Sequence, residues 1–205
     1  MADSFSGEPS TTWLSQPAGS DRLMRLNEAF WFVDPDDKRW DAPKGSVVDG
    51  ASIPRPLWTL VGSPYTGAYR RASIVHDIAC DRASGDVEAR RAADRMFYNA
   101  CRAGGCSVEE ATKLYVGVRI GAGWDQVSAW SQASPPGVQA RTILPPADRR
   151  VEADFQSAAE RILAEGAVDD IAEIERRTDA ALADIAGVDP MGPPARRSRP
   201  PPESR

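Results

Sequence analysis

Residues 70–98 read RRASIVHDIACDRASGDVEARRAADRMFY, and this stretch decides the fold. Apolar residues recur at helical spacing from residue 68 to about residue 81, and a second segment rich in Ala, Arg and Glu follows at 87–102. Ser84-Gly85-Asp86 separates the two segments, because Gly interrupts a helix and Asp86 can cap the next one. The stretch therefore predicts two helices that are joined by a short turn and lie antiparallel.

The sequence on either side of this pair predicts a third helix and short strands. Gly104-Gly105 ends the second helix, and residues 107–110 (SVEE) carry the capping-box pattern that begins another. Upstream, residues 22–33 and 39–40 flank the turn sequence DPDD at 34–37, which indicates a β-hairpin. We expect an α+β, mainly helical fold, in which short N-terminal hairpins pack on a three-helix core containing a His-Asp helix pair.

Composition divides the chain into five parts. Residues 1–20 are polar and rich in Ser and Thr, which predicts a flexible arm, and residues 21–130 form the expected globular domain. Residues 131–148 (SQASPPGVQARTILPPAD) are typical of a linker. Residues 149–186 carry apolar residues at helical spacing and predict an acidic amphipathic helical hairpin, whereas the Pro- and Arg-rich residues 187–205 predict a disordered tail.

Charge is uneven along the chain. Residues 151–186 hold ten Asp or Glu and three Arg, and residues 187–205 hold two acids and four Arg, so the net charge of −5 leaves residues 1–150 near neutral. A nucleic-acid-binding domain normally carries a basic surplus, so no nucleic-acid partner is predicted. The acidic hairpin cannot bury its apolar stripe alone, and we expect it to pack on itself, on the main domain or on a partner protein.

The sequence carries no sign of a membrane span or of secretion. No apolar run approaches the ~18 residues that a transmembrane helix needs, and no signal-peptide pattern is present. Three cysteines favour reduced thiols, although a bridge between Cys101 and Cys106 is conceivable. We expect a soluble protein in the cytoplasm of the producing cell, or one that is virion-associated or delivered by lysis or injection.

His76 is the only histidine, and Asp77 follows it directly. Adjacent helical residues point ~100° apart, so these two side chains face different directions. His76 lies nine residues before Gly85 and Asp94 lies nine residues after it, so an antiparallel helix pair places His76 and Asp94 at the same height. Asp94 would hold the imidazole in one tautomer and leave the other ring nitrogen to act as a general base on water. Asp77 would be free to ligate a hard cation such as Ca²⁺.

The segment DGASIP at 49–54 supplies further candidate groups. Asp49 either joins the site as a second metal ligand or acid, or satisfies backbone amides in a tight turn. Ser52 is a candidate hydrogen-bonding group beside it. It is not expected to be a nucleophile, because no GxSxG sequence surrounds it.

Other residues near the helix pair have both a functional and a structural interpretation. Tyr69 either lines a substrate mouth or packs in the core. Cys80 shares a helix face with His76, and its spacing favours packing over a nucleophilic Cys-His pair. A lone histidine on a partly apolar helix is itself often a core residue. Asp94 can pair instead with Arg90 or Arg91 on its own helix.

The sequence HDIAC, followed on the next helix by DRMFY, resembles the catalytic helix pair of phospholipase A2, especially its compact prokaryotic forms. The resemblance implies that His76 activates water, that Asp77 binds Ca²⁺ and that Asp94 orients the histidine. Tyr98 matches one of the aromatic residues that follow the second Asp in that family. The family's Gly-rich Ca²⁺ loop corresponds here to residues 49–52, which contain one Gly.

A longer signature resembles a different family. PKGSVVDGASIPRPLW (43–58), GSPYTGAY (62–69) and IVHDIAC (74–80) occur in the order typical of domain-of-unknown-function family 1353, found in bacteria and their phages. The similarity spans about residues 26–125. It implies a small domain encoded largely by phages and prophages, with no settled activity.

Together these patterns favour a phage- or prophage-type hydrolase that acts on an ester, with a phospholipid as the first expected substrate and Ca²⁺ as the candidate cofactor. The alternative is a non-enzymatic phage or virion-associated protein whose helices at 149–186 bind a partner. A toxin or effector is a third hypothesis. A single histidine excludes multi-histidine phosphohydrolase sites and HExxH zinc peptidases, and no P-loop or GxGxxG sequence is present.

Overall fold

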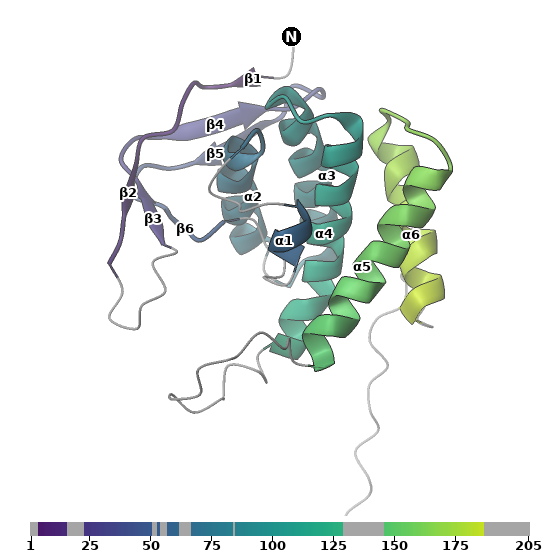
Figure 1. Ribbon diagram of the computed structural model, residues 1–205. Coiled ribbons are helices and arrows are strands. Elements are labelled where there is room, and N and C mark those ends of the chain that lie inside the picture. Colours follow the sequence, from purple (N-terminus) through teal and green to yellow (C-terminus); the bar gives the residue numbers. More distant parts are fainter. Residues whose placement is uncertain are drawn as a thin grey trace, which may run out of the picture.

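The computed structural model describes residues 4–15, 23–50, 53, 57–61, 67–83, 85–128 and 146–186. Within these residues, two small antiparallel sheets lie on one side of a group of helices, and a pair of C-terminal helices lies on the other side (Figure 1). The expected α+β, mainly helical fold class is confirmed.

Each sheet has three short strands. One sheet has the order β1 (Ser4–Phe5), β4 (Phe30–Val33), β5 (Arg39–Ala42), and the other has the order β2 (Thr11–Trp13), β3 (Met24–Leu26), β6 (Val47–Val48). β4 and β5 form the hairpin that the DPDD sequence predicts. Asp34 Oδ1 closes its turn by accepting hydrogen bonds from the backbone N–H groups of Asp36 and Lys38, at 3.0 and 2.9 Å.

The first two strands correct one expectation. Residues 1–20 were expected to form a flexible arm, but β1 pairs with β4 and β2 pairs with β3. The Phe5 ring lies 4.9 Å from the Phe32 ring between centroids, so an aromatic contact accompanies the backbone ladder. The prediction of a flexible arm is therefore wrong for the strands in this segment.

The helices are α1 (Trp58–Val61), α2 (Arg70–Arg82), α3 (Val87–Ala103), α4 (Val108–Ser128), α5 (Pro146–Ala164) and α6 (Ile171–Ala186). α2, α3 and the start of α4 lie close to the expected positions, whereas α1 is a short helix that the sequence patterns did not predict. Asp86 caps α3 by accepting from the backbone N–H of Ala89 at 3.0 Å, and Ser107 and Glu110 form the predicted capping box of α4. No helix in the described ranges has the length and apolar character to cross a lipid bilayer.

α2 is enclosed by other elements of the fold on both sides. It packs against α3 on one side and against β4, β5 and β6 on the other, and its residues 72–79 are all buried. This run includes Ser73, His76 and Asp77 among apolar residues. Because a buried polar group without a partner is costly, these side chains must find partners inside the protein.

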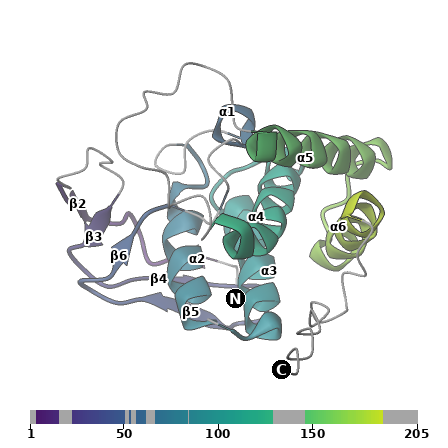
Figure 2. The same ribbon diagram turned by 90° about the horizontal axis from the view of Figure 1, so that it is seen from below.

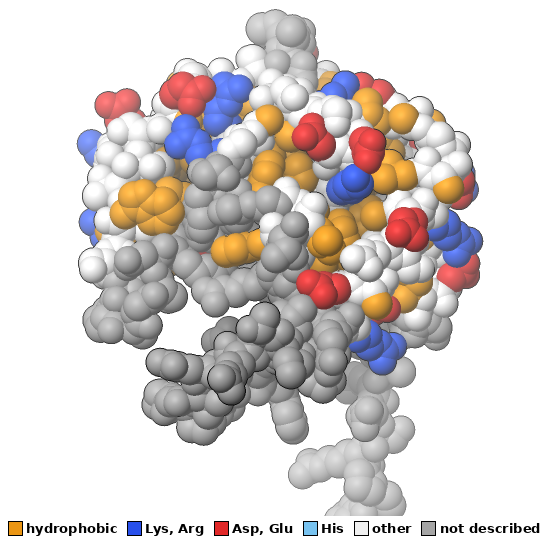
Figure 3. Space-filling model, viewed as in Figure 1, with side chains coloured by type: hydrophobic (Ala, Val, Ile, Leu, Met, Phe, Trp, Pro, Cys, Tyr) orange, Lys and Arg blue, Asp and Glu red, His pale blue; other side chains and the backbone are white. Residues whose placement is uncertain are grey.

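The two C-terminal helices pack on each other and on the main domain. Seen from below, α5 lies across α4, and α6 runs beside α3 (Figure 2). Acidic side chains of α6 meet arginines of α3: Arg91 Nη1 lies 3.1 Å from Glu175 and 2.8 Å from Asp179. On the face shown in Figure 3, positive and negative side chains lie close together on the side of the molecule where α5 and α6 pack. The predicted hairpin therefore folds back, and most of the predicted linker (131–145) and the whole tail (187–205) lie outside the described residues.

Gly104 marks a close approach between the end of α3 and the segment before α2. An added Cβ at this position would lie 2.3 Å from the carbonyl oxygen of Ala68. We expect Gly104→Ala to lower the free energy of unfolding by about 1–3 kcal/mol in urea denaturation, because the backbone must shift. Gly117→Ala is the matched control: its Cβ would make an ordinary 3.5 Å contact with Ile53, and stability should hold or rise by up to about 1 kcal/mol. Equal stability of the two variants would contradict the close approach.

Candidate functional site

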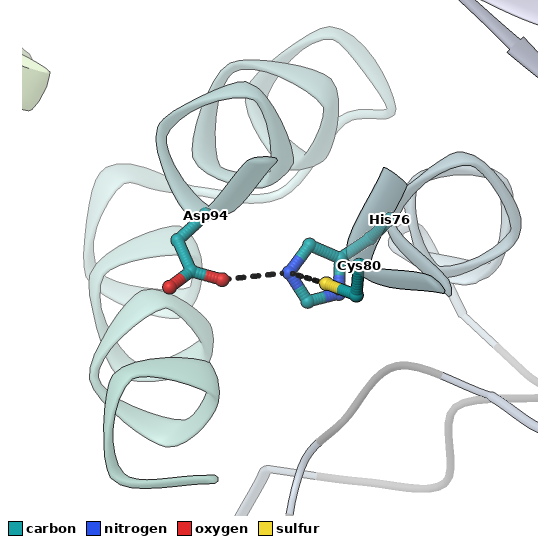
Figure 4. Close-up of side chains that lie close together, drawn as sticks. All are labelled: His76, Cys80 and Asp94. Atoms are coloured by element: carbon teal, nitrogen blue, oxygen red, sulfur yellow. Dashed lines mark hydrogen bonds and ion pairs between the residues drawn. The ribbon is translucent and has the colours of Figure 1, made fainter. Parts of the chain in front are cut away.

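His76 of α2 faces Asp94 of α3 across the interface between the two helices. His76 Nε2 lies 2.8 Å from Asp94 Oδ1, and both side chains are 0% exposed (Figure 4). The equal spacing of the two residues from Gly85 explains their meeting, because α2 and α3 pack against each other around that turn. No histidine is visible on the face shown in Figure 3, in keeping with this burial. The contact that the spacing predicts is present, and the catalytic roles of the two residues stay predictions.

Cys80 is the third member of this cluster. Its Sγ lies 3.3 Å from His76 Nε2 and 3.7 Å from His76 Nδ1, and Figure 4 shows the sulfur against the imidazole ring. Cys80 is half-buried and is the most exposed of the three residues. None of the cysteines forms a disulfide. The Phe97 ring covers the imidazole from α3, with 4.7 Å between ring centroids.

Two guanidinium groups approach Asp94. Arg90 Nε lies 3.4 Å from Oδ1, and Arg119 Nη1 of α4 lies 3.9 Å from Oδ2. Arg119 Nη2 in turn lies 2.9 Å from Asp179 Oδ1 of α6. Both guanidinium groups lie where they can offset the cost of burying the carboxyl group of Asp94. Sequence reasoning identified Arg90 as a partner but missed Arg119 and Asp179, which are remote in the chain and carry no local signal.

The environment of His76 favours its neutral form. Burial lowers the pKa of His76 below its usual value, and the hydrogen bond and charge of Asp94 oppose that shift only in part. A neutral imidazole beside a carboxylate donates its proton from Nε2 to Asp94 Oδ1, and Nδ1 then keeps its lone pair. This protonation state is the one that a general base needs.

Asp77 points away from His76 and serves the turn that begins DGASIP. Its Oδ2 accepts hydrogen bonds from the backbone N–H groups of Gly50 at 2.8 Å and Asp49 at 3.2 Å. The backbone of Gly50 has a φ of 90°, a conformation that side chains rarely adopt. Burial, followed by the charge of Asp49, raises the pKa of Asp77 well above its usual value. The backbone amides of residues 49 and 50 are thus held by Asp77.

The remaining candidate residues either make no hydrogen bond with His76 and Asp94 or lie outside the described residues. Ser52 lies outside the described residues. Tyr69 is buried just before α2, and its hydroxyl has no hydrogen-bond partner among the described residues. Tyr98 donates its hydroxyl to Asp169 Oδ1, at 2.9 Å, in the turn between α5 and α6. Neither tyrosine hydroxyl forms a hydrogen bond with His76 or Asp94, and their auxiliary roles stay predictions.

Comparison with known proteins supports the resemblance of the main domain to domain-of-unknown-function family 1353. Residues 24–118 match the model of the family described as "Protein of unknown function (DUF1353)". The family predicted from the three ordered motifs is thus confirmed over this segment, and α5 and α6 lie outside it. The resemblance of the helix pair to phospholipase A2 is not confirmed.

Two relatives come from Sinorhizobium fredii (strain NBRC 101917 / NGR234). The uncharacterized protein y4jT is 37% identical over 123 residues, which are 56% of this chain and 35% of y4jT. The uncharacterized protein y4iH is 36% identical over 99 residues, which are 48% of this chain and 39% of y4iH. The chain therefore spans well under half the length of either relative. No solved structure matches it.

The contacts of Asp77 generate a prediction about stability. Asp77→Asn keeps an oxygen that can accept from both backbone amides but carries no charge. Because the folded-state pKa is raised, the contribution of Asp77 to stability is present below its unfolded pKa and is lost as pH rises through the folded pKa. We therefore expect the variant to be at least as stable as the parent protein at pH 8, and its advantage in free energy of unfolding to shrink at pH 5.

Urea denaturation at the two pH values checks this expectation. Asp77→Ala is the matched control: it also lacks the charge but loses the acceptor, so it should be less stable than Asp77→Asn by about 1–3 kcal/mol at both pH values. An Asp77→Asn protein that is clearly less stable than the parent at pH 8 would show that the charge is needed.

Proposed function

We propose that this chain is a hydrolase in which His76 activates a water molecule for attack on an ester, with Asp94 as the residue that orients the imidazole. The observation that carries the proposal is the 2.8 Å contact between His76 Nε2 and Asp94 Oδ1 on facing helices. A carboxylate at Nε2 fixes the tautomer with the lone pair on Nδ1, and it stabilises the imidazolium that forms during the reaction.

The chemistry then proceeds at Nδ1. Water gives a proton to Nδ1 while its oxygen bonds to the ester carbonyl carbon, and the leaving alkoxide takes that proton when the tetrahedral intermediate collapses. In the structure the imidazole is enclosed, and Cys80 Sγ is 3.7 Å from Nδ1. We infer that water and substrate approach from the side of Cys80, the half-buried member of the cluster, after its side chain moves.

Ca²⁺ takes no part in this proposed reaction. A hard cation prefers ionised carboxylate oxygens, but Asp77 is buried with a raised pKa, and its Oδ2 already accepts from two backbone amides. Asp77 and Asp49 therefore fit a Ca²⁺ ion poorly in this conformation. A phospholipid ester stays the first substrate to test, and the phage or prophage setting stays an expectation from the family resemblance.

A second candidate function is non-enzymatic, and the burial of the site favours it. With both His76 and Asp94 fully enclosed, their hydrogen bond can serve solely to fix α2 against α3. The chain would then act by binding a partner. The acids that α6 directs at α3 and α4, Glu175 and Asp179, are occupied by arginines, so a partner would have to use other parts of the C-terminal hairpin.

Asp94→Asn separates the two candidates. The amide keeps the size of the side chain but removes the charge that stabilises the imidazolium. We expect ester hydrolysis to fall by at least about 100-fold while circular dichroism shows an intact fold. The assay uses phospholipid vesicles and a small chromogenic ester, each with Ca²⁺ and with a chelator.

Asp81→Asn is the matched control, because Asp81 is an exposed acid that lies one turn after Asp77 on α2. This variant should keep full activity. The hydrolase proposal would be contradicted if the parent protein turned over none of the esters. It would also be contradicted if a folded Asp94→Asn protein kept full activity. A histidine variant, His76→Gln, that loses only stability would support the non-enzymatic candidate.

A further inference from the structure

We propose that His76, Cys80 and Asp94 together form a binding site for a transition-metal ion, with Zn²⁺ as the ion that their chemistry favours. A ring nitrogen, a sulfur and a carboxylate oxygen, one from each residue, all lie within 4.8 Å of one another. The inference concerns the same side chains as the proposed hydrolysis, but it does not depend on that activity.

Two of the three distances between donor atoms are near those of a tetrahedral zinc site, and the third, between Cys80 Sγ and the Asp94 oxygen, is at most 4.8 Å. Zinc ligands at about 2.0–2.3 Å from the ion are separated from one another by about 3.3–3.6 Å. Cys80 Sγ is 3.3 Å from His76 Nε2, but it is also 3.7 Å from Nδ1 and lies against the ring rather than in line with the Nε2 lone pair (Figure 4), so the Cys80 side chain must rotate toward the ion. Asp94 Oδ1 and His76 Nε2 are 2.8 Å apart, because a hydrogen bond joins them. An ion that replaces the bonding proton therefore requires these two atoms to separate by about half an ångström.

The chemistry of the donor set selects the class of ion. Imidazole and thiolate are ligands for Zn²⁺ and its neighbours in the first transition series, whereas Mg²⁺ and Ca²⁺ prefer oxygen. His76 and Cys80 are four residues apart on α2 and share one face of that helix, and Asp94 completes the set from α3. Three protein ligands leave a fourth position, which water can fill.

Nearby charges set the expected strength of binding. Arg90 and Arg119 both approach Asp94 and oppose a second cation, while the Cys80 thiolate that forms on binding adds a compensating negative charge. We therefore expect a dissociation constant of about 10 μM or tighter at neutral pH, weaker than in closed four-ligand zinc sites.

Metal binding and general-base activity exclude each other at this site. The ion takes the lone pair of Nε2, so the imidazole proton moves to Nδ1, and the Cys80 thiol proton is released to solvent. With Nδ1 protonated, His76 can no longer accept a proton from water. Bound Zn²⁺ would thus inhibit the hydrolysis proposed above.

The test measures binding directly on the full chain with reduced thiols. Calorimetry with Zn²⁺ should give one ion per chain, and Co²⁺ should give tetrahedral d–d bands together with a near-ultraviolet thiolate charge-transfer band. Cys80→Ser should remove the charge-transfer band and weaken Zn²⁺ binding by at least about 100-fold, and Asp94→Asn should weaken it as well. Cys106→Ser and Asp81→Asn, which change a thiol and an acid outside the cluster, should leave both readouts unchanged.

Two results would overturn the proposal. The first is a dissociation constant weaker than about 10 μM for both ions, which is weaker than a site with three protein ligands should give. The second is a charge-transfer band that survives Cys80→Ser, which would assign the thiolate to another cysteine. Both readouts are independent of catalysis, so metal binding without ester hydrolysis contradicts the proposed function alone, and hydrolysis without metal binding contradicts the metal site alone.

Discussion

The hydrogen bond between His76 and Asp94 is the constraint on which the rest of the structure depends. It joins two fully buried polar side chains in the middle of the interface between α2 and α3. Burying either group without the other would leave an unsatisfied donor or an uncompensated charge, each far more costly than the bond is stabilising. The two helices are therefore held in one register, and the arginines that surround Asp94 are needed for the same reason.

A second buried carboxyl, Asp77, performs the corresponding task on a different face of α2. It connects this helix to the backbone of Asp49 and Gly50, which precede it by almost thirty residues. The adjacent polar residues of the HD dipeptide thus tie one helix to two different parts of the fold. Any chemistry at His76 is performed on a side chain whose neighbours on both sides are fixed.

The elements with local signals could be predicted from the sequence. The helix pair, the Asp86 cap and the Ser107-Glu110 capping box follow from short-range rules, and the equal spacing about Gly85 predicts the partner of His76. The contacts that were missed are long-range. Arg119 reaches Asp94 only because α4 packs beside α3, and the polar N-terminal segment forms strands only because β3 and β4 offer edges to it. The spacing of Cys80 indicated a shared face, but the position of its sulfur against the ring depends on side-chain packing.

The chain of charges from Asp94 through Arg119 to Asp179 and Arg91 has an evolutionary consequence. It physically joins α6, which lies outside the family match, to the centre of the domain that the family shares. A substitution of Asp179 would remove the acid that Arg91 and Arg119 share and would leave them with Glu175 and Asp94, respectively. We therefore expect positions 91, 119 and 179 to vary together among chains that carry this hairpin. Relatives that lack the hairpin would need another anion beside Arg119 or a different residue at that position. We therefore expect the C-terminal helices to coevolve with the domain on which they pack.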